Sequence, residues 1–423
     1  MWKRGGTEMI LHVDANCAYL SWTAAALLEQ GYPVDLRQIP SVIAGNPEDR
    51  HGIILAKSIP AKKLGIGTAC SLFEAFQKCP DLVVFPPDYD LFLACSDAMY
   101  RILQDYSPVI QRYSVDECFV DLSGSSRDGN AAVETAFIIK ERICRELGFT
   151  VNVGVGPNKV LAKMAGELSK PDKVHTLVTH REIEEKLWPL PVGELFMVGR
   201  ASCRKLLKIN VRTIGDLAGC NPELLHQLLK GHGLLIWEYA NGIDHDRVVP
   251  NGQIVQKGLS NSMTLPYDVT EEDTVQMYLL SLSERVTSRL RRHECKASLI
   301  GVSVKSCSFF HYTHQIQLPF YTDDTTAIYQ YACRLFRECW RKEPVRQIGI
   351  HLTAFAKRDE YQLSLGELQR IEEDEALNGT VDKIRERFGS TAIFRGTFVN
   401  TEMKPIEGGV NDGNYMMMGG YKL

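Results

Sequence analysis

The sequence predicts an α+β protein of several domains. Its 423 residues exceed the roughly 100–200 residues of one domain, and 44% hydrophobic with 24% charged residues is typical of a folded chain. Strand patterns alternate with helical patterns up to about residue 173, whereas residues 182–243 show helical periodicity alone. A second alternation of strands and helices follows at residues 257–360. We therefore expect a mixed domain, a helical region and a second mixed domain.

The first mixed region starts with an apolar run, MILHVDA at residues 9–15, which predicts a buried strand ending in an aspartate. The alternation that follows is typical of an α/β or α+β domain. The elements expected in order are a helix at 22–30, short strands and turns at 34–57, helices up to about 106, two strands meeting at a turn at 109–122, a helix at 131–147, a strand at 150–156 and a helix at 158–170.

The helical region predicts short helices only. Within it the segment VGRASCRKLLKINVRTIGDLA, residues 198–218, predicts a helix, a tight turn and a second helix. Thr213 is placed to be the N-cap of that second helix. Proline and glycine interrupt the periodic pattern at residues 244–256, so this stretch predicts a linker.

The second mixed region predicts the order β-α-β-β-α-β, a split βαβ sandwich that presents one open sheet face. The pattern weakens after residue 361. There, residues 381–394 predict one more helix, and residues 410–423 predict a disordered end.

Composition argues against several classes of protein. No run of about 18 or more apolar residues occurs, so we expect no membrane span. The apolar stretch near the start is short and ends in an aspartate, so it predicts a buried strand rather than a signal peptide. The 12 cysteines form no CxxC pair and no Cys/His cluster with zinc-ligand spacing, which favours reduced thiols in a cytoplasmic protein. The net charge of −4 argues against a generally basic surface, but local basic patches for nucleic acid are compatible with it.

Three carboxylates give the strongest chemical signal. Asp14 ends an apolar strand, and Asp116 and Glu117 stand side by side between two strands about 100 residues later. Adjacent carboxylates repel each other, and their burial is costly unless a cation neutralises them. Hard oxygen ligands suit Mg²⁺, and two such ions can activate an attacking hydroxyl and stabilise the leaving oxygen of an in-line displacement. Taken alone, an Asp-Glu pair in a turn is more often a solvated surface pair.

Six segments form an ordered set with characteristic spacing. They are HVDANCAY at 12–19, IPAKKLGI at 59–66, YSVDECFVDLSG at 113–124, GVGPNKVLAKMAGELSKP at 154–171, FMVGRASCRKLLKINVRTIGDLA at 196–218 and KGLSNSMTL at 257–265. This set resembles the Y family of translesion DNA polymerases, particularly its DNA polymerase IV group. The similarity extends over roughly residues 9–360, and the combined set is highly specific.

The resemblance implies a right-hand polymerase with a palm, small fingers, a helical helix-hairpin-helix thumb and a β-α-β-β-α-β little finger. The implied boundaries are 1–25 and 85–173 for the palm, 26–84 for the fingers, 174–243 for the thumb, 244–256 for the linker, 257–361 for the little finger and 362–423 for a C-terminal tail. The implied activity is template-directed DNA synthesis from a primer 3′ end, with low fidelity, across DNA lesions. No second nuclease domain is apparent, so we expect no proofreading.

The resemblance also assigns two magnesium ions to the acidic residues. The family's metal ligands match Asp14, the backbone carbonyl of Ala15 and Asp116, and Glu117 matches the second catalytic acid beside the primer terminus. The implied partners are primer-template DNA and deoxynucleoside triphosphates, bound by a monomer.

Nucleotide contacts are implied for four residues. Tyr19 matches the steric gate beneath the sugar, Lys62 a basic residue of the fingers and Lys170 a lysine of the palm, while the amides near Ala18 and Tyr19 would face phosphate. Without the resemblance, Lys62 fits an ordinary solvated lysine and Lys170 fits a cation at a helix C-terminus before Pro171. Tyr19 fits a core aromatic equally well.

Three residues depart from the family pattern. Asn16 stands where DNA polymerase IV usually has aspartate, although the related DNA polymerase V has asparagine there. Ala18 replaces an aromatic neighbour of the gate. Ile59 replaces a tyrosine whose hydroxyl helps to hold the triphosphate, and the loss of such a charge-assisted hydrogen bond costs about 1.5–3 kcal/mol. We therefore expect weak nucleotide affinity with retained activity.

Nucleic-acid and clamp contacts are implied more loosely. The thumb hairpin would bind phosphates through amides near Gly199. Arg289, Arg292 and Lys305 of the second mixed region would lie along the duplex backbone, although a charge run is most often a solvated helix end. Residues 362–365, with Gln362, Leu363 and Leu365, resemble the start of a peptide that binds the replicative sliding clamp, but Gly366 replaces its usual aromatic.

Two alternatives remain open at this point. A nucleotide cyclase could share a palm with paired acids, but it would lack the thumb hairpin and the second split βαβ domain. A catalytically weak or inactive DNA-binding relative is compatible with the departures at Ala18 and Ile59.

Overall fold

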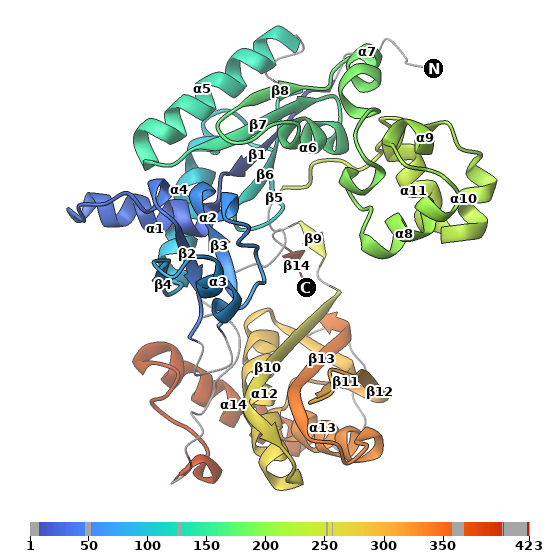
Figure 1. Ribbon diagram of the computed structural model, residues 1–423. Helices are drawn as coiled ribbons and strands as arrows, with labels where there is room; N and C mark the ends of the chain where they lie inside the picture. Colours follow the sequence, from blue (N-terminus) through green and yellow to red (C-terminus); the bar gives the residue numbers. More distant parts are fainter. Residues whose placement is uncertain are drawn as a thin grey trace. The chain divides into compact units, whose positions relative to one another are not determined.

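The computed structural model describes residues 8–46, 52–124, 129–250, 253–255, 257–357, 368–399, 401 and 421–422 (Figure 1). These residues divide into two compact units, of which the first extends to Ile254 and the second starts at Val255. Both mix helices and sheets, which confirms the predicted α+β class. No helix in the described ranges is long and apolar enough to cross a membrane.

A five-stranded sheet forms the centre of the first unit, in the order β5-β6-β1-β7-β8. All neighbouring strands are antiparallel except β7 and β8. The strands are β1 (Ile10–Ala15), β5 (Ile110–Arg112), β6 (Glu117–Asp121), β7 (Val151–Gly156) and β8 (Val174–Thr176). Every residue of β1 and β7 is buried, because these two strands lie inside the sheet and are covered on both faces.

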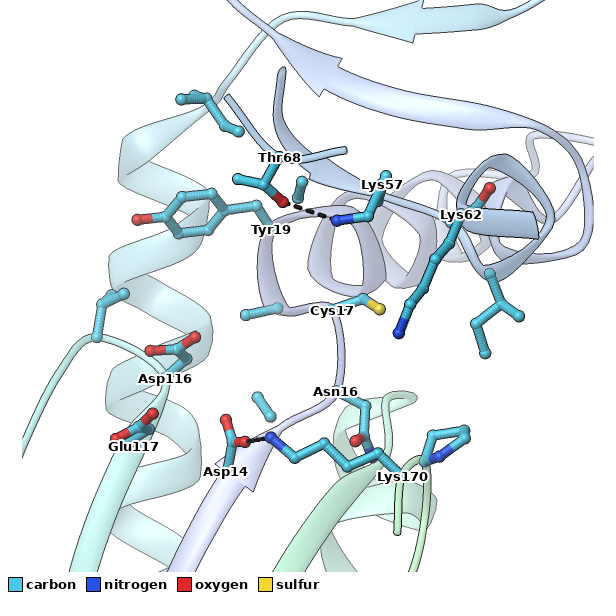
Figure 2. Close-up of a pocket in the computed structure, with 18 residues that line it drawn as sticks. Asp14, Asn16, Cys17, Tyr19, Lys57, Lys62, Thr68, Asp116, Glu117 and Lys170 are labelled. Carbon is cyan, nitrogen blue, oxygen red and sulfur yellow. Dashed lines mark hydrogen bonds and ion pairs between the residues drawn. The ribbon is translucent and has the colours of Figure 1, made fainter. Parts of the chain in front are cut away.

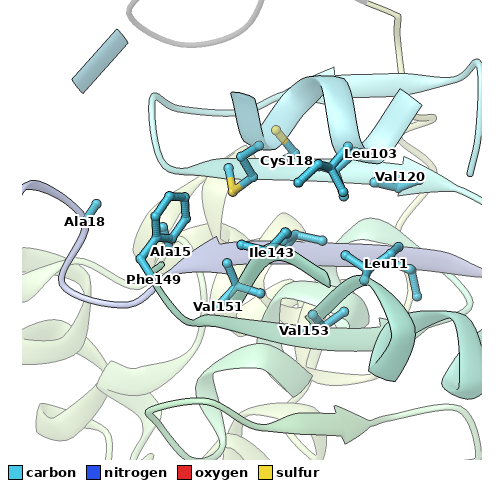
Figure 3. Close-up of a cluster of buried hydrophobic side chains, with 14 of the residues drawn as sticks. Leu11, Ala15, Ala18, Leu103, Cys118, Val120, Ile143, Phe149, Val151 and Val153 are labelled. Atoms are coloured by element: carbon cyan, nitrogen blue, oxygen red, sulfur yellow. The ribbon is translucent and has the colours of Figure 1, made fainter. Parts of the chain in front are cut away.

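The strand periodicity of two sorts side chains between the two faces of this sheet. Leu11, Val120 and Val153 belong to the main core, which helices α1 (Ala18–Glu29), α4 (Tyr89–Gln104) and α5 (Gly129–Leu147) complete. Figure 3 shows Leu103 and Ile143 of these helices over the strands. Helix α6 (Lys159–Glu167) packs against β1 and β7.

Two glycines bring α6 into direct contact with β7. A Cβ atom at Gly154 would lie 1.9 Å from the carbonyl oxygen of Ala162, and one at Gly156 would lie 2.5 Å from the amide nitrogen of that residue. Real Cβ contacts are essentially never shorter than 3.0 Å, so only glycine fits at these positions. The GVG part of the sequence motif is therefore a packing requirement.

A small three-stranded sheet, β3-β2-β4, has a core of its own and lies largely in residues 26–84, the segment expected to form the fingers, which we call the finger segment. Its elements are η1 (Leu36–Gln38), β2 (Ser41–Ala44), β3 (Ile54–Lys57), α2 (Ile59–Lys63), α3 (Leu72–Lys78) and β4 (Val83–Phe85). Ser58 is the N-cap of α2: its Oγ accepts from the amide of Ala61 at 3.1 Å and donates to the carbonyl of Ile39 at 2.7 Å. This buried serine fixes the direction of α2.

The helical region confirms the predicted hairpin. Its elements are α7 (His180–Glu182), η2 (Ile183–Leu187), η3 (Val192–Glu194), α8 (Arg200–Lys208), α9 (Ile214–Ala218), α10 (Pro222–Leu229) and α11 (Gly231–Ala240). Thr213 caps α9 as expected, with its side chain accepting from the amide of Asp216 at 3.0 Å. Val160 and Leu161 of α6 join the core of this region.

The second unit has the predicted order β-α-β-β-α-β and an antiparallel sheet in the order β10-β13-β11-β12. Its elements are β10 (Gly258–Val269), α12 (Glu272–Arg292), β11 (Cys295–Ser306), β12 (His311–Thr322), α13 (Thr325–Cys339) and β13 (Val345–Lys357). The edge strand β12 alternates between exposed and less exposed residues, as expected for a sheet with one open face.

Two helices start earlier than predicted. Helix α1 starts at Ala18 because Cys17, with φ 50°, turns the chain directly after β1. Helix α14 (Leu368–Phe388) starts before residue 381, and ion pairs tie it to unit 2, since Asp382 contacts Arg291 at 2.6 Å and Glu375 contacts Lys296 at 2.6 Å. The remaining short elements are β9 (Ile254–Val255), η4 (Gly396–Phe398) and β14 (Tyr421–Lys422).

Candidate active site

A cavity of about 590 Å³ opens between the central sheet and the finger segment (Figure 2). Its walls come from the end of β1, the start of α1, the β3–α2 connection, the β5–β6 turn and the segment after α6. The predicted site residues that line it are Asp14, Ala15, Ala18, Tyr19, Lys62, Asp116, Glu117 and Lys170. The fold thus brings all the predicted metal and nucleotide residues to one cavity.

Strand pairing brings the three carboxylates to the same end of the sheet. Asp14 on β1 is the register partner of Glu117 on β6. The amide of Ala15 donates to the carbonyl of Asp116 at 3.0 Å, which fixes the β5–β6 turn against the end of β1. Asp14 is buried, and Asp116 and Glu117 are half-buried. Residues about 100 positions apart in sequence are therefore neighbours at the same end of two adjacent strands.

Each carboxylate has its own protein partner. The ammonium of Lys170 pairs with Asp14 and also contacts Glu167 at 2.8 Å. The hydroxyl of Ser114 donates to Asp116. Glu117 receives the ammonium of Lys163 at 2.6 Å.

Burial and charge act in opposite directions on these groups. Burial raises the pKa of Asp14 despite the charge of Lys170, and it raises the pKa of Asp116 despite the bond from Ser114. Burial also acts to raise the pKa of Glu117, but the contacts with His12 and Lys163 outweigh this effect and lower that pKa to about 2. The negative charge of Glu117 contributes to the raised pKa of both aspartates, so the three groups share one electrostatic environment.

The chemistry of this donor set fits a hard divalent cation. Carboxylates and the nearby carbonyl of Ala15 are the oxygen ligands that Mg²⁺ accepts. Asn16 also lines the cavity, and its Oδ1 is buried without a hydrogen-bond partner in the described structure. Among the described residues, however, no three acidic, histidine or cysteine side chains are gathered closely enough to hold an ion as they stand. The ammonium of Lys170 contacts Oδ2 of Asp14, so this oxygen would have to leave that contact to bind an ion.

The finger side of the cavity is cationic. Lys62 extends from α2 into the cavity, and Lys57 at the end of β3 donates to Thr68 Oγ1 at 2.8 Å (Figure 2). Within the described ranges, neither lysine pairs with a carboxylate. Burial raises the pKa of the Cys17 thiol, while the charges of Lys57, Lys62 and Lys170 act to lower it. The positive charges of all three ammonium groups are therefore felt at Cys17, directly before α1.

Tyr19 is held rigidly in the cavity wall. Its ring stacks on Phe92 with a centroid distance of 4.3 Å and an interplanar angle of 8°, and it meets Tyr89 edge-on at 6.4 Å. Tyr19 is also half-buried. The preceding Ala18 is buried as the first residue of α1, and no side chain caps that helix. Both residues thus line the cavity at the start of α1.

The predicted DNA contacts lie elsewhere in the two units. Gly199 is the N-cap of α8 and lines a hollow together with Arg200 and Arg204. Arg289 and Arg292 lie in the last turn of α12, and Lys305 lies near the end of β11. The proposed clamp peptide with Gln362, Leu363 and Leu365 falls outside the described residues.

Sequence reasoning missed three residues of the site. His12 Nε2 lies 3.3 Å from Glu117 Oε2, Lys163 contacts the same oxygen, and Lys57 faces the cavity from the fingers. Lys163 stands inside the motif at 154–171, and His12 two residues before Asp14, so a period-two pattern on β1 could have pointed to His12. Lys57 had no local signal beyond its place before the α2 cap.

Comparison with known proteins identifies the family of this chain. The impB/mucB/samB family profile matches residues 13–167, which include all three carboxylates, and the C-terminal domain profile of that family matches residues 256–365. DNA polymerase IV of Clostridium acetobutylicum is 43% identical over 94% of this chain and 100% of its own length. The chain belongs to the Y family of DNA polymerases.

Further relatives extend the agreement. DNA polymerase IV 1 of Bacillus subtilis is 32% identical over 96% of each chain. A solved chimeric Y-family DNA polymerase made from Dbh and Dpo4 has a TM-score of 0.71 to this chain at 21% identity, and the match covers 82% of this chain and 99% of the chimera. That similarity confirms the predicted polymerase fold. Members of the Y family are metal-dependent nucleotidyltransferases.

Proposed function

We propose that this chain is a translesion DNA polymerase that adds deoxynucleotides to a primer 3′ end in the cavity described above. Template-directed DNA synthesis is the activity of its family, and relatives that match nearly its whole length are named DNA polymerase IV. One observation supports it most in this chain: three acids line a single cavity together with two lysines, Lys57 and Lys62, that form no ion pair among the described residues. An inactive relative is not favoured, because no acid of the set is missing.

We assign two magnesium ions to Asp14, the Ala15 carbonyl, Asp116 and Glu117. Buried carboxylates with raised pKa values gain most from a cation, because the cation removes the cost of their charge. Ions bound there would stabilise negative charge on the attacking and leaving oxygens. Lys163 and His12 hold Glu117 ionised, and so keep its oxygens available as acceptors.

Lys170 has two roles in this proposal. Without a nucleotide its ammonium neutralises Asp14. A triphosphate offers a stronger counterion, so nucleotide binding would draw Lys170 away from Asp14 and free that carboxylate. Lys62 and Lys57 would bind the same triphosphate from the fingers, where the isoleucine at position 59 cannot donate a hydrogen bond.

Sugar selection is assigned to Tyr19. Its ring cannot swing away easily, since Phe92 and Tyr89 contact it. A rigid ring beneath the sugar would clash with a 2′-hydroxyl and leave deoxyribose undisturbed. The departure at Ala18 leaves this arrangement in place, because the stacking partners come from α4.

The proposed contacts with DNA are made to phosphates and therefore do not depend on the base sequence. Amides at the start of α8, next to Gly199, would bind phosphate beside Arg200 and Arg204. Arg289, Arg292 and Lys305 would contact the duplex backbone. We further propose that the chain acts as a monomer in the cytoplasm, where its 12 free cysteines would stay reduced, and that residues 362–365 bind the sliding clamp.

Primer extension on an undamaged template with Mg²⁺ tests the proposal. The wild-type chain should extend the primer, and chelation of divalent ions should stop it. Asp116→Ala should abolish synthesis and leave DNA affinity nearly unchanged. Glu134→Ala, which changes an exposed carboxylate on α5, is the matched control and should behave like wild type. Synthesis that survives Asp116→Ala would refute the metal assignment, and a wild-type chain that cannot extend any primer would refute the function.

A further inference from the structure

The β11–β12 turn of the second unit exposes two adjacent phenylalanines. The side chains of Phe309 and Phe310 are 63% and 49% exposed. Phe309 has φ 64°, a left-handed conformation that is rare for a bulky residue. Two hydrogen bonds of 2.9 Å hold this conformation, from the Phe309 amide to the Ser306 carbonyl and from the Ser306 amide to the Phe310 carbonyl. The exposed rings and the left-handed backbone are both unfavourable in the folded state, and the turn nevertheless holds these rings at the surface.

Cations surround the two rings. The Arg346 guanidinium lies 4.8 Å from the centroid of Phe309, and the Lys305 ammonium lies 5.8 Å from the same centroid. The Arg341 guanidinium lies 4.7 Å from the centroid of Phe310 and 5.2 Å from that of Tyr312. We call these six residues the aromatic patch: Lys305, Phe309, Phe310, Tyr312, Arg341 and Arg346.

The patch is rigidly built and has an unbalanced positive charge. The Cys307 amide donates to the Pro344 carbonyl at 2.9 Å, which ties the β11–β12 turn to the connection between α13 and β13. Within the described residues, none of its three cations forms an ion pair with a carboxylate. The neighbouring Glu343 forms no ion pair with these cations among the described residues, and its Oε2 is buried without a hydrogen-bond partner there.

We infer that the aromatic patch binds unpaired nucleotides of single-stranded DNA. Exposed rings offer stacking surfaces to bases, and the cations beside each ring would contact the phosphates that alternate with those bases along a strand. Duplex DNA would use only the cations, because its bases are already stacked and cannot reach a ring. An acidic peptide would likewise leave the rings without a function. The inference needs no catalysis, so it stands or falls independently of the active-site assignment.

The test is equilibrium binding of the full chain to a labelled oligodeoxythymidine of about 12 nucleotides and to a blunt duplex of the same length, by fluorescence anisotropy. Replacing both rings, Phe309→Ala with Phe310→Ala, should raise the Kd for the single strand at least about fivefold and change the Kd for the duplex less than about twofold. Tyr267→Ala is the matched control, since this 55% exposed aromatic lies on β10 at the opposite edge of the same sheet.

Two further variants separate stacking from simple charge. Replacing both rings by tryptophan should restore single-strand affinity, because a larger ring still stacks. Arg341→Gln with Arg346→Gln should weaken binding and reduce its salt dependence. Thermal unfolding of each variant checks its fold. If the alanine variant does not fold, the tryptophan and glutamine variants supply the result.

Four outcomes would overturn the inference. They are unchanged single-strand affinity in the double alanine variant, an equal loss for the duplex, an equal loss in Tyr267→Ala, and competition by polyglutamate as effective as that by the oligonucleotide. The last result would instead indicate an acidic protein partner.

Discussion

The packing of α6 on β7 predicts that Gly154→Ala disables the enzyme, although Gly154 does not line the cavity. The added Cβ would lie 1.9 Å from the Ala162 carbonyl oxygen and 2.4 Å from the Gly166 amide nitrogen. Both atoms belong to the backbone of α6, so no rotation of a side chain can relieve the clash. The helix would have to retreat by about 1 Å to restore a contact of 3.0 Å.

The cost follows from this displacement. Overpacking typically costs 1–3 kcal/mol, and a clash with backbone belongs at the upper end, so we expect a loss of about 3 kcal/mol in the free energy of unfolding. Helix α6 also carries Lys163, whose ammonium lies 2.6 Å from Glu117. A displacement of about 1 Å in a positioning group can lower the rate on the order of 100-fold. Stability and activity should therefore fall together.

Urea unfolding and steady-state primer extension measure the two effects on the same preparation. Gly124→Ala is the matched control, because an added Cβ there meets nothing within 4 Å, and it should change the unfolding free energy by no more than about 0.5 kcal/mol. If Gly154→Ala were as stable and as active as wild type, the close contact between α6 and β7 would not be a packing requirement. A stability loss with full activity would refute only the proposed link from α6 to Glu117.

Three substitutions in the cavity give further predictions. Lys57→Ala should raise the KM for deoxynucleotides at least about fivefold, since a charge-assisted contact is lost; an equal rise in Lys63→Ala, whose exposed lysine does not line the cavity, would contradict a specific role. Ile59→Tyr should lower the KM for deoxynucleotides, because it restores a hydroxyl donor. An unchanged KM would contradict the idea that the triphosphate lacks a hydrogen bond at position 59. Tyr19→Ala should admit ribonucleotides in single-nucleotide incorporation, and unaltered sugar selection would remove Tyr19 as the gate.

Local patterns predicted most elements correctly. The two strands around residues 109–122, the helix at 131–147 and the whole β-α-β-β-α-β order were confirmed, because their periodicity extends over enough residues to separate strand from helix. The start of α1 was placed four residues late, since the chain reverses direction at Cys17 without a glycine or proline to mark it. Helix α14 was placed late because ion pairs to α12 and β11, rather than its own pattern, tie it to the second unit.

Only some features of the candidate site could likewise be predicted from the sequence. The acids and Lys62 were predictable, since each stands in a motif whose spacing resembles the family. The partners of the acids were not predictable. Lys170 was expected to reach a triphosphate, yet it pairs with Asp14 across 156 positions of sequence, and Lys163 pairs with Glu117 across 46. Such pairs depend on strand register and on how closely α6 approaches the sheet.

The sequence alone determined the element order, the set of acids and the polymerase family, because each depends on short-range periodicity or on motif spacing. The folded chain adds the cavity that joins those acids to Lys57 and Lys62, the counterions that set their charge, and the exposed aromatic turn of the second unit. These features arise where segments distant along the chain pack together. Coulombic and hydrogen-bond energies depend on distances of a few ångströms, which no spacing along the chain specifies.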